Sequence, residues 1–144
     1  MTRPAGRDAR DPAVVRALAI DRASPPRERT IDITTTGRRS GEQRRIEIWF
    51  YRIEGKVHLS SPPATRGWYA NLVAHPAFTV HLKHGVRADL AATAVPVTEE
   101  GERRRLLAEV VAVLDQDRMR ALYGPPAPLE AFVAGSPLVE VRFS

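Results

Sequence analysis

Residues 34–45 read TTTGRRSGEQRR and place four arginines and two glycines between two segments with strand periodicity. Residues 30–34 alternate apolar and polar side chains before this stretch, and residues 46–50 do the same after it. Gly37 and Gly41 allow backbone angles that expose successive N–H groups, and arginine adds forked donors that match phosphate or carboxylate oxygens. We interpret the stretch as an anion-binding loop between two strands, and composition alone leaves an ordinary solvated turn as the alternative.

Length and composition restrict the class of protein. The chain has 144 residues, which suits one domain, and its 22 Lys and Arg against 17 Asp and Glu give a net charge of +5 that favours phosphate or carboxylate partners. The absence of cysteine excludes disulfides, thiolate metal sites and cysteine nucleophiles. No apolar run approaches the roughly 20 residues of a membrane-spanning helix, and the polar start lacks a secretory pattern. We therefore expect a cytoplasmic protein without an integral membrane segment.

Periodicity predicts the remaining elements. Besides the first pair, strands are expected over residues 56–60, 77–82, 86–97 and 138–143. Helices are expected over residues 12–21, 68–75 and 129–134, together with a longer helix that is capped by Thr98. Consecutive strands with hairpin connections and few helices favour an antiparallel sheet closed into a small barrel, which is a mainly β (α+β) fold.

The chain contains the motif TTGRRSG at residues 35–41, then Arg44, a strand pair, the pattern WYxNL at residues 68–72, and Pro76. With these features the sequence resembles the deazaflavin-dependent nitroreductase family, also described as quinone reductases. The match runs from about Ile31 to Leu82. The resemblance implies a split β-barrel of about six antiparallel strands with a few peripheral helices. Residues 1–24 would form an N-terminal arm with a short helix, and residues 25–144 the barrel domain. This domain would bind the 8-hydroxy-5-deazaflavin coenzyme F420 in a groove.

The resemblance also implies roles for single residues. The phosphate end of the cofactor would be held by Arg38, Arg39, Ser40, Gly41 and Arg44. Ser60 and Ser61 would lie near the phosphate or the ring, while Trp68 would pack against the cofactor and Asn71 would bond to it.

Two positions depart from the family pattern. Residues 61–64 read SPPA where relatives often have a glycine-rich stretch with a lysine, so this loop is stiffer and lacks that cation. Glu47 stands where relatives commonly have proline. A carboxylate there would repel an anionic cofactor unless Arg45 or Arg52 pairs with it.

The activity that the resemblance implies is hydride transfer from the reduced deazaflavin to a quinone, a nitroaromatic compound or an enone. A proton must follow the hydride, and Tyr69 and Tyr123 are the candidate donors, with His81 a weaker one. For each tyrosine, packing or a structural hydrogen bond is the alternative role. The four histidines lack ligand spacing, so no metal site is expected. Loop shapes around Pro62, Tyr123 and residues 125–126 would set the substrate preference, which the sequence does not specify.

Alternatives stay open at this stage. The same fold could bind FMN or haem, or could carry the deazaflavin without turnover. A nucleic-acid-binding barrel would use the arginine loop with aromatic stacking groups, but the few aromatic residues and the interspersed acidic ones disfavour it. A monomer and a homodimer both stay open.

Overall fold

The computed structural model describes residues 7–64 and 67–144, and its strands close into one barrel. The six strands are β1 (Thr30–Thr36), β2 (Gln43–Ile53), β3 (Lys56–Ser60), β4 (Ala77–Leu82), β5 (Ala88–Pro96) and β6 (Leu138–Phe143). They are hydrogen-bonded in the order β1-β2-β3-β6-β5-β4, with β4 closing on β1, and every pair is antiparallel. The predicted barrel is confirmed.

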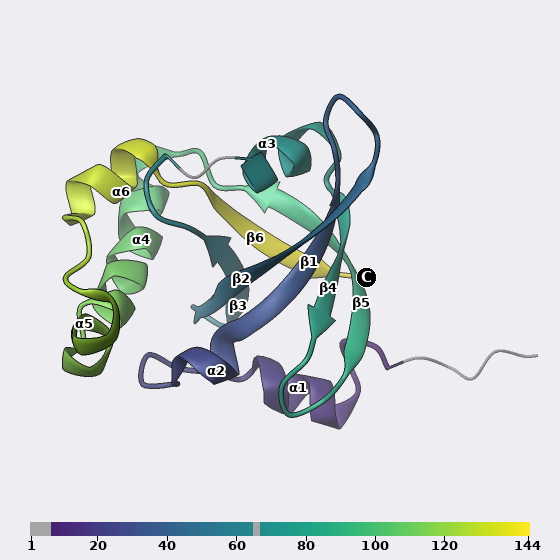
Figure 1. Ribbon diagram of the computed structural model, residues 1–144, viewed down its shortest axis with the longest axis horizontal. Coiled ribbons are helices and arrows are strands. Elements are labelled where there is room, and N and C mark those ends of the chain that lie inside the picture. The colour runs from purple at the N-terminus through teal and green to yellow at the C-terminus, as the bar shows by residue number, and fades with distance from the viewer. Residues whose placement is uncertain (1–6, 65–66) are drawn as a thin grey trace, which may run out of the picture.

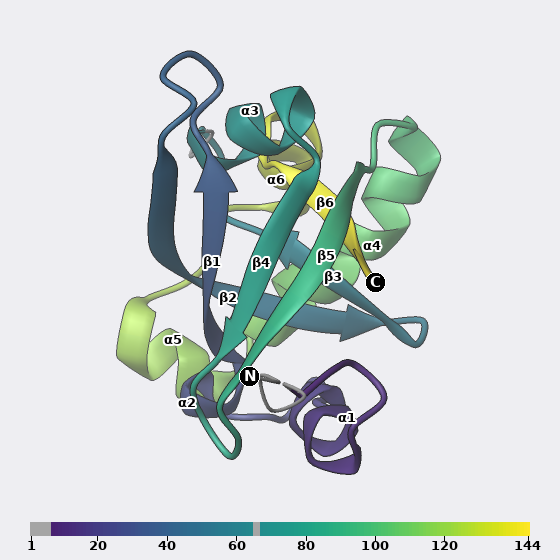
Figure 2. The same ribbon diagram turned by 90° about the vertical axis from the view of Figure 1, so that its right-hand side faces the viewer.

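Helices surround the barrel instead of alternating with its strands (Figure 1). They are α1 (Pro12–Leu18), α2 (Pro26–Arg29), α3 (Gly67–Ala74), α4 (Glu100–Leu114), α5 (Asp117–Tyr123) and α6 (Leu129–Gly135). Figure 2 shows α3 and the β1–β2 loop together at one end of the barrel, with α1 and α2 at the other. Within the described ranges, no helix is both long and apolar enough to cross a membrane.

The structure differs from the predicted elements in several places: β1 and β2 extend further into the loop between them than residues 30–34 and 46–50, β5 is shorter than residues 86–97, and the short helix α2 was not predicted. The helix expected over residues 12–21 ends at Leu18. The cap predicted at Thr98 is wrong, because Glu99 caps the helix: its carboxylate accepts hydrogen bonds from the N–H groups of Gly101, at 3.0 Å, and Glu102 in the first turn. The helix α5 was not predicted, because Met119 is its one buried residue and so its sequence shows no apolar stripe.

Strand alternation on β2 divides the core into two clusters. Ile48 and Phe50 belong to the cluster that fills the barrel, together with apolar residues from the other strands. Tyr51 and Ile53 belong to a second cluster, which packs the outer face of the sheet against α4, α5 and α6. One strand thus joins the barrel to the helical layer (Figure 1).

Arg29 fixes the segment before β1 to this strand. Arg29 is 1% exposed, and its guanidinium donates to the carbonyl oxygens of Phe50 at 3.2 Å and Asp21 at 2.8 Å and lies 5.4 Å from the Tyr51 ring centre. Burial lowers the pKa of Arg29 and raises the pKa of Tyr51 to about 12. The buried cation is thus satisfied by backbone oxygens and an aromatic face.

Candidate functional site

The arginine-rich loop folds as a compact turn at one end of the barrel. The Gly37 N–H donates to the carbonyl of Glu42 at 2.7 Å, and the Gly41 N–H donates to the carbonyl of Gly37 at 2.9 Å. Gly41 has a φ of +70°, in the left-handed region that glycine adopts without strain. A Cβ on Gly37 would lie 2.4 Å from Ser40 Oγ, so a larger residue there would have to displace Ser40.

The helix α3 braces this loop through Asn71. The side-chain oxygen of Asn71 accepts from the Arg38 N–H at 3.0 Å, and its amide nitrogen donates to Thr35 Oγ1 at 3.2 Å. Thr35 is buried, so the loop is held to a rigid part of the barrel. Both polar atoms of Asn71 therefore bind the protein itself, and they position the arginines that follow.

A cleft of about 630 Å³ lies between the loop, β2 and α3, and we call it the basic cleft. It is lined by Thr35, Arg38, Arg44, Ile46, Gly67, Trp68, Ala70 and Asn71. In the described part of the chain, the side chains of Arg38 and Arg44 form no ion pair, whereas Arg22, Arg104 and Arg105 on the helical side bind Glu109, Glu130 and Glu54. The two lining guanidiniums are thus available to an anionic ligand.

A second cleft, of about 510 Å³, lies between the outer face of β2 and β3 and the helical layer, and we call it the apolar cleft. Its polar lining comprises Glu47, Ser60, Ser61 and the hydroxyl-bearing rings of Tyr51 and Tyr123. The remaining lining is apolar or glycine: Ile48, Trp49, Pro62, Pro63, Val110, Leu114, Met119, Gly124, Pro125, Pro126, Ala127 and Phe132. The segments expected to set substrate preference therefore meet in one place.

Two contacts shape this apolar cleft. Tyr123 packs edge-to-face on Trp49 with ring centres 5.3 Å apart, although Tyr123 is itself 62% exposed. Ser60 Oγ donates to the carbonyl of Pro137 at 2.8 Å. The buried serine thus holds the end of β3, while the aromatic pair forms an exposed wall.

The two clefts follow one another along β2. Arg44 and Ile46 line the basic cleft, and the next residues on the strand, from Glu47 to Trp49, line the apolar cleft. A hydrogen bond of 3.1 Å from Trp68 Nε1 to Ser61 Oγ joins their walls. A ligand with an anionic end and a flat apolar end would match this succession.

A family model for the F420H(2)-dependent quinone reductases matches residues 23–122. The chain belongs to this family. The match confirms the resemblance seen in the sequence and extends it from the first strands into α5.

Solved structures share the fold of this F420H(2)-dependent quinone reductase family member. A FAD-binding protein from Mesorhizobium loti is 11% identical, with a TM-score of 0.58 over 92% of this chain and 87% of that one. The heme storage protein HutZ from Vibrio cholerae is 15% identical, with a TM-score of 0.52 over 81% of this chain and 82% of that one. These likenesses confirm a split-barrel fold. No curated protein matches the sequence significantly.

The predicted site residues fall into distinct places. Arg38, Arg44, Trp68 and Asn71 line the basic cleft, and Ser60 and Ser61 line the apolar cleft. Arg39, Ser40 and Gly41 are exposed on the loop, outside the residues that line the basic cleft. The wall of the apolar cleft that Val110, Met119 and Phe132 form was not predicted, because it depends on how α4, α5 and α6 dock on β2 and leaves no local pattern in the sequence.

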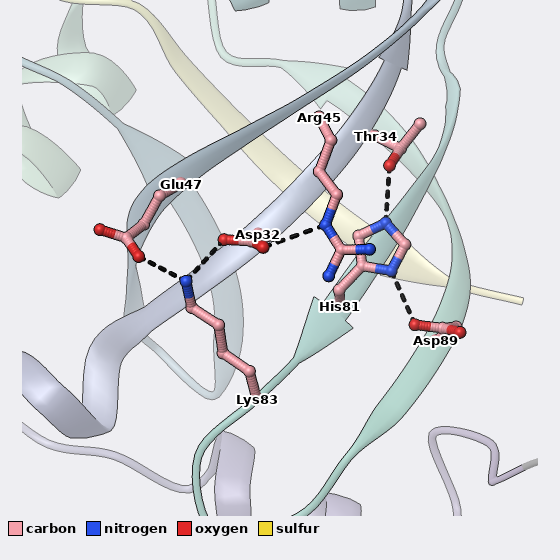
Figure 3. A network of polar contacts seen from close by, with 7 residues as sticks. All are labelled: Asp32, Thr34, Arg45, Glu47, His81, Lys83 and Asp89. Carbon is pink, nitrogen blue, oxygen red and sulfur yellow. Dashed lines mark hydrogen bonds and ion pairs between the residues drawn. The ribbon is translucent and has the colours of Figure 1, made fainter.

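The three candidate proton donors lie in different parts of the structure. Tyr123 lines the apolar cleft, whereas Tyr69 lines a different cavity, of about 240 Å³, with Thr98 and Ser136. His81 lies on the outer barrel face, where Nε2 is 2.6 Å from Thr34 Oγ1 and Nδ1 is 2.7 Å from an Asp89 oxygen (Figure 3). Of the three, Tyr123 is the one that reaches a cleft on β2.

Glu47 has a partner that was not predicted. Neither Arg45 nor Arg52 binds it within the described residues; instead Lys83 Nζ donates to Glu47 and, at 2.8 Å, to Asp32 (Figure 3). Arg45 binds the other oxygen of Asp32 at 3.0 Å. The bonds to Asp32 and Glu47 raise the pKa of Lys83, and although burial alone would raise the pKa of Asp32, the bonds from Lys83 and Arg45 lower it.

A metal centre was not expected from the sequence. Over residues 7–64 and 67–144, no group of three or more His, Asp or Glu side chains is arranged to hold a metal ion.

Proposed function

We propose that this protein transfers a hydride from reduced F420 to an electron-poor small molecule such as a quinone, a nitroaromatic compound or an enone. The observation that carries the proposal is the succession of a basic cleft and an apolar cleft along β2. F420 has an anionic phosphodiester and glutamyl tail attached to a flat ring system, and its ring supplies the hydride when it is bound. The donor set and the apolar walls therefore fit this cofactor.

Arg38 and Arg44 would bind the phosphate end in the basic cleft. Their guanidiniums have no carboxylate to displace in the described structure, and forked donors match phosphate oxygens. Arg39, on the exposed part of the loop, would add charge near the tail rather than a lining contact.

The apolar cleft would hold the ring and the substrate. Its volume of about 510 Å³ is within the range of about 300 to 1,000 Å³ that small-molecule sites occupy. Trp49 and Tyr123 would supply aromatic contacts, and Ser61 would lie where the ring gives way to the linker. Pro62 and Pro63 line this cleft, so in this arrangement the change from the family pattern would affect the ring and substrate end rather than the phosphate end.

The proton that completes the reduction would come from solvent or from Tyr123. The Tyr123 ring is more than half exposed at the mouth of the apolar cleft, so water reaches the same region. Trp68 and Asn71 would act by fixing the cleft wall and the loop, because their polar atoms bind Ser61, Thr35 and the Arg38 backbone.

The test is a titration of the purified protein with reduced and oxidised F420, with FMN in parallel and with the visible absorbance of the isolated protein recorded for haem. Selective F420 binding followed by oxidation of F420H2 with a quinone or nitroaromatic acceptor would support the proposal. Binding without turnover on any acceptor would favour a carrier. Binding of FMN or haem alone, or no binding of F420, would overturn the cofactor assignment while leaving the fold unchanged.

A further inference from the structure

Glu47 is the one charged side chain among the described residues that line the apolar cleft. It is the residue after Ile46, which lines the basic cleft, so the main chain of β2 passes from one cleft to the other at Glu47. The side chain is 64% exposed and is therefore in reach of a ligand that spans both clefts. If F420 binds as proposed, this junction is where its hydroxylated linker joins the ring to the phosphate.

An unpaired carboxylate at this point would oppose an anionic cofactor. Like charges repel each other more strongly where a protein wall replaces part of the solvent between them. The repulsion would be aggravated by Asp32, which is the direct partner of Glu47 in the register of β1 with β2.

Lys83 cancels this repulsion by bridging both carboxylates. It lies just after β4, and the pairing of β4 with β1 brings its ammonium between Asp32 and Glu47 (Figure 3). Its side chain is 24% exposed, which keeps the bridge partly shielded from salt. With Arg45 on Asp32, the cluster contains two acidic and two basic side chains and is neutral.

We propose that Lys83 is a positioning residue for cofactor binding: it neutralises Glu47 and fixes that carboxylate as a hydrogen-bond acceptor for the linker of the cofactor. The inference rests on the proposed function and deepens it. The acceptor role follows from the exposed carboxylate, whose oxygens offer more lone pairs than the ammonium of Lys83 uses.

The experiment measures the Kd for F420 at low salt in the wild type, Lys83→Met and the double variant Glu47→Gln/Lys83→Met. We expect the single variant to bind about three- to tenfold more weakly, and the double variant to return near the wild-type Kd, because glutamine keeps an acceptor oxygen without the charge. Raising the salt to about 0.5 M should shrink the gap between the single variant and the wild type, because this screens the exposed part of the repulsion.

Lys56→Met is the matched control. It also removes one lysine that is paired with a glutamate, Glu140 at 3.6 Å, but Lys56 lies at the start of β3 and lines neither cleft. Its Kd should stay near that of the wild type, as should that of the conservative variant Lys83→Arg. Thermal unfolding of each protein establishes that binding is measured on folded protein. Lys83→Gln, which keeps two donors without the charge, replaces Lys83→Met if the latter does not fold, with the same expected loss.

An unchanged Kd in Lys83→Met would overturn the inference, and so would a double variant that binds as weakly as the single one or a control with an equal loss. A purely structural role would lower the unfolding temperature without rescue of the Kd by Glu47→Gln. Failure of the wild type to bind F420 at all is a separate result, which removes the proposed function itself.

Discussion

The basic cleft and the apolar cleft lie in sequence along one strand, yet they are built in opposite ways. The basic cleft is framed by a short loop and one helix turn, whose hydrogen bonds hold Arg38 near Asn71. The apolar cleft is walled by side chains of the second core cluster, among them Val110, Met119 and Phe132, each at most 2% exposed. Arginines without ion-pair partners among the described residues define the basic cleft, whereas tightly packed core side chains define the apolar cleft.

This difference separates two kinds of mutational effect. Removing a guanidinium from the basic cleft takes away a ligand contact but no internal ion pair, so binding should fall while stability stays constant. Removing a wall residue of the apolar cleft opens a cavity in the core, so stability should fall first.

The largest effect should come from Arg38→Ala combined with Arg44→Ala. A hydrogen bond to a charged group contributes about 1.5 to 3 kcal/mol, so the loss of both arginines should weaken F420 binding by at least about a hundredfold. The measurement is the Kd for F420, with the unfolding temperature recorded beside it.

The control for this prediction is Arg104→Ala combined with Arg105→Ala. It removes the same charge from arginines that already bind Glu130 and Glu54 on the helical side. Its Kd should change little, and equal losses in the two double variants would mean that total charge, rather than the basic cleft, determines binding.

The next effect should come from Met119→Ala, on stability. Met119 is 1% exposed in the second core cluster and lines the apolar cleft. Replacing a buried Met by Ala costs about 2 to 5 kcal/mol of unfolding free energy. Leu122→Ala in the same helix is the control, because Leu122 is 60% exposed and its loss should cost less than about 0.5 kcal/mol. Denaturant unfolding measures the unfolding free energy of both variants. Similar losses in the two would contradict a packed wall at Met119.

The loop side of the basic cleft could be predicted from the sequence because its elements are local, whereas Trp68 and Asn71 on α3 were assigned a role only through the family resemblance. The loop lies within one hairpin, and alternation on both sides identified the strands; the ranges expected for β3, β4 and β6 agree with the structure. The turn between β2 and β3 falls at Glu54 and Gly55, and both have positive φ, 54° and 76°.

The apolar cleft could not be predicted in the same way. Its wall depends on how α4, α5 and α6 dock on β2, and α5 has one buried residue and no apolar period. The partner of Glu47 was missed for a similar reason, because Lys83 is 36 residues away and reaches it through the pairing of β1 with β4. The periodicity of a single strand does not show which distant strand pairs with it or in which register.

A smaller effect should distinguish the two roles of Tyr123. Tyr123→Ala removes an aromatic ring from the lining of the apolar cleft. An aromatic contact with the cofactor ring would contribute about 0.5 to 1.5 kcal/mol, so F420 binding should weaken by up to about tenfold. Tyr123→Phe keeps the ring and should keep the wild-type kcat, because the exposed position allows solvent to supply the proton. A fall in kcat of about a hundredfold in Tyr123→Phe would instead identify the hydroxyl as the proton donor.

The smallest effect should be a pH dependence of the unfolding free energy that arises from His58, a buried residue of β3. His58 lies on the face of β3 that also carries Ser60, is 2% exposed, and has Nδ1 3.1 Å from the carbonyl of Lys56. Burial lowers its pKa in the folded state, so the unfolded chain takes up the proton first once the pH falls below about 6.5. The stability present above that pH should therefore decline as the pH falls from about 7.5 to 5.5.

The lowered pKa of Glu140, which is set first by its bond to Arg142, acts below about pH 4.5 and lies outside this window. Denaturant unfolding of the wild type and of His58→Gln at both pH values measures the slope. The variant should lose less stability on acidification, because glutamine has no proton to bind. If the unfolding free energy of the two proteins falls equally with pH, a group other than His58 titrates in this range. The core around the apolar cleft would then differ from the basic cleft in its packing but not in its response to pH.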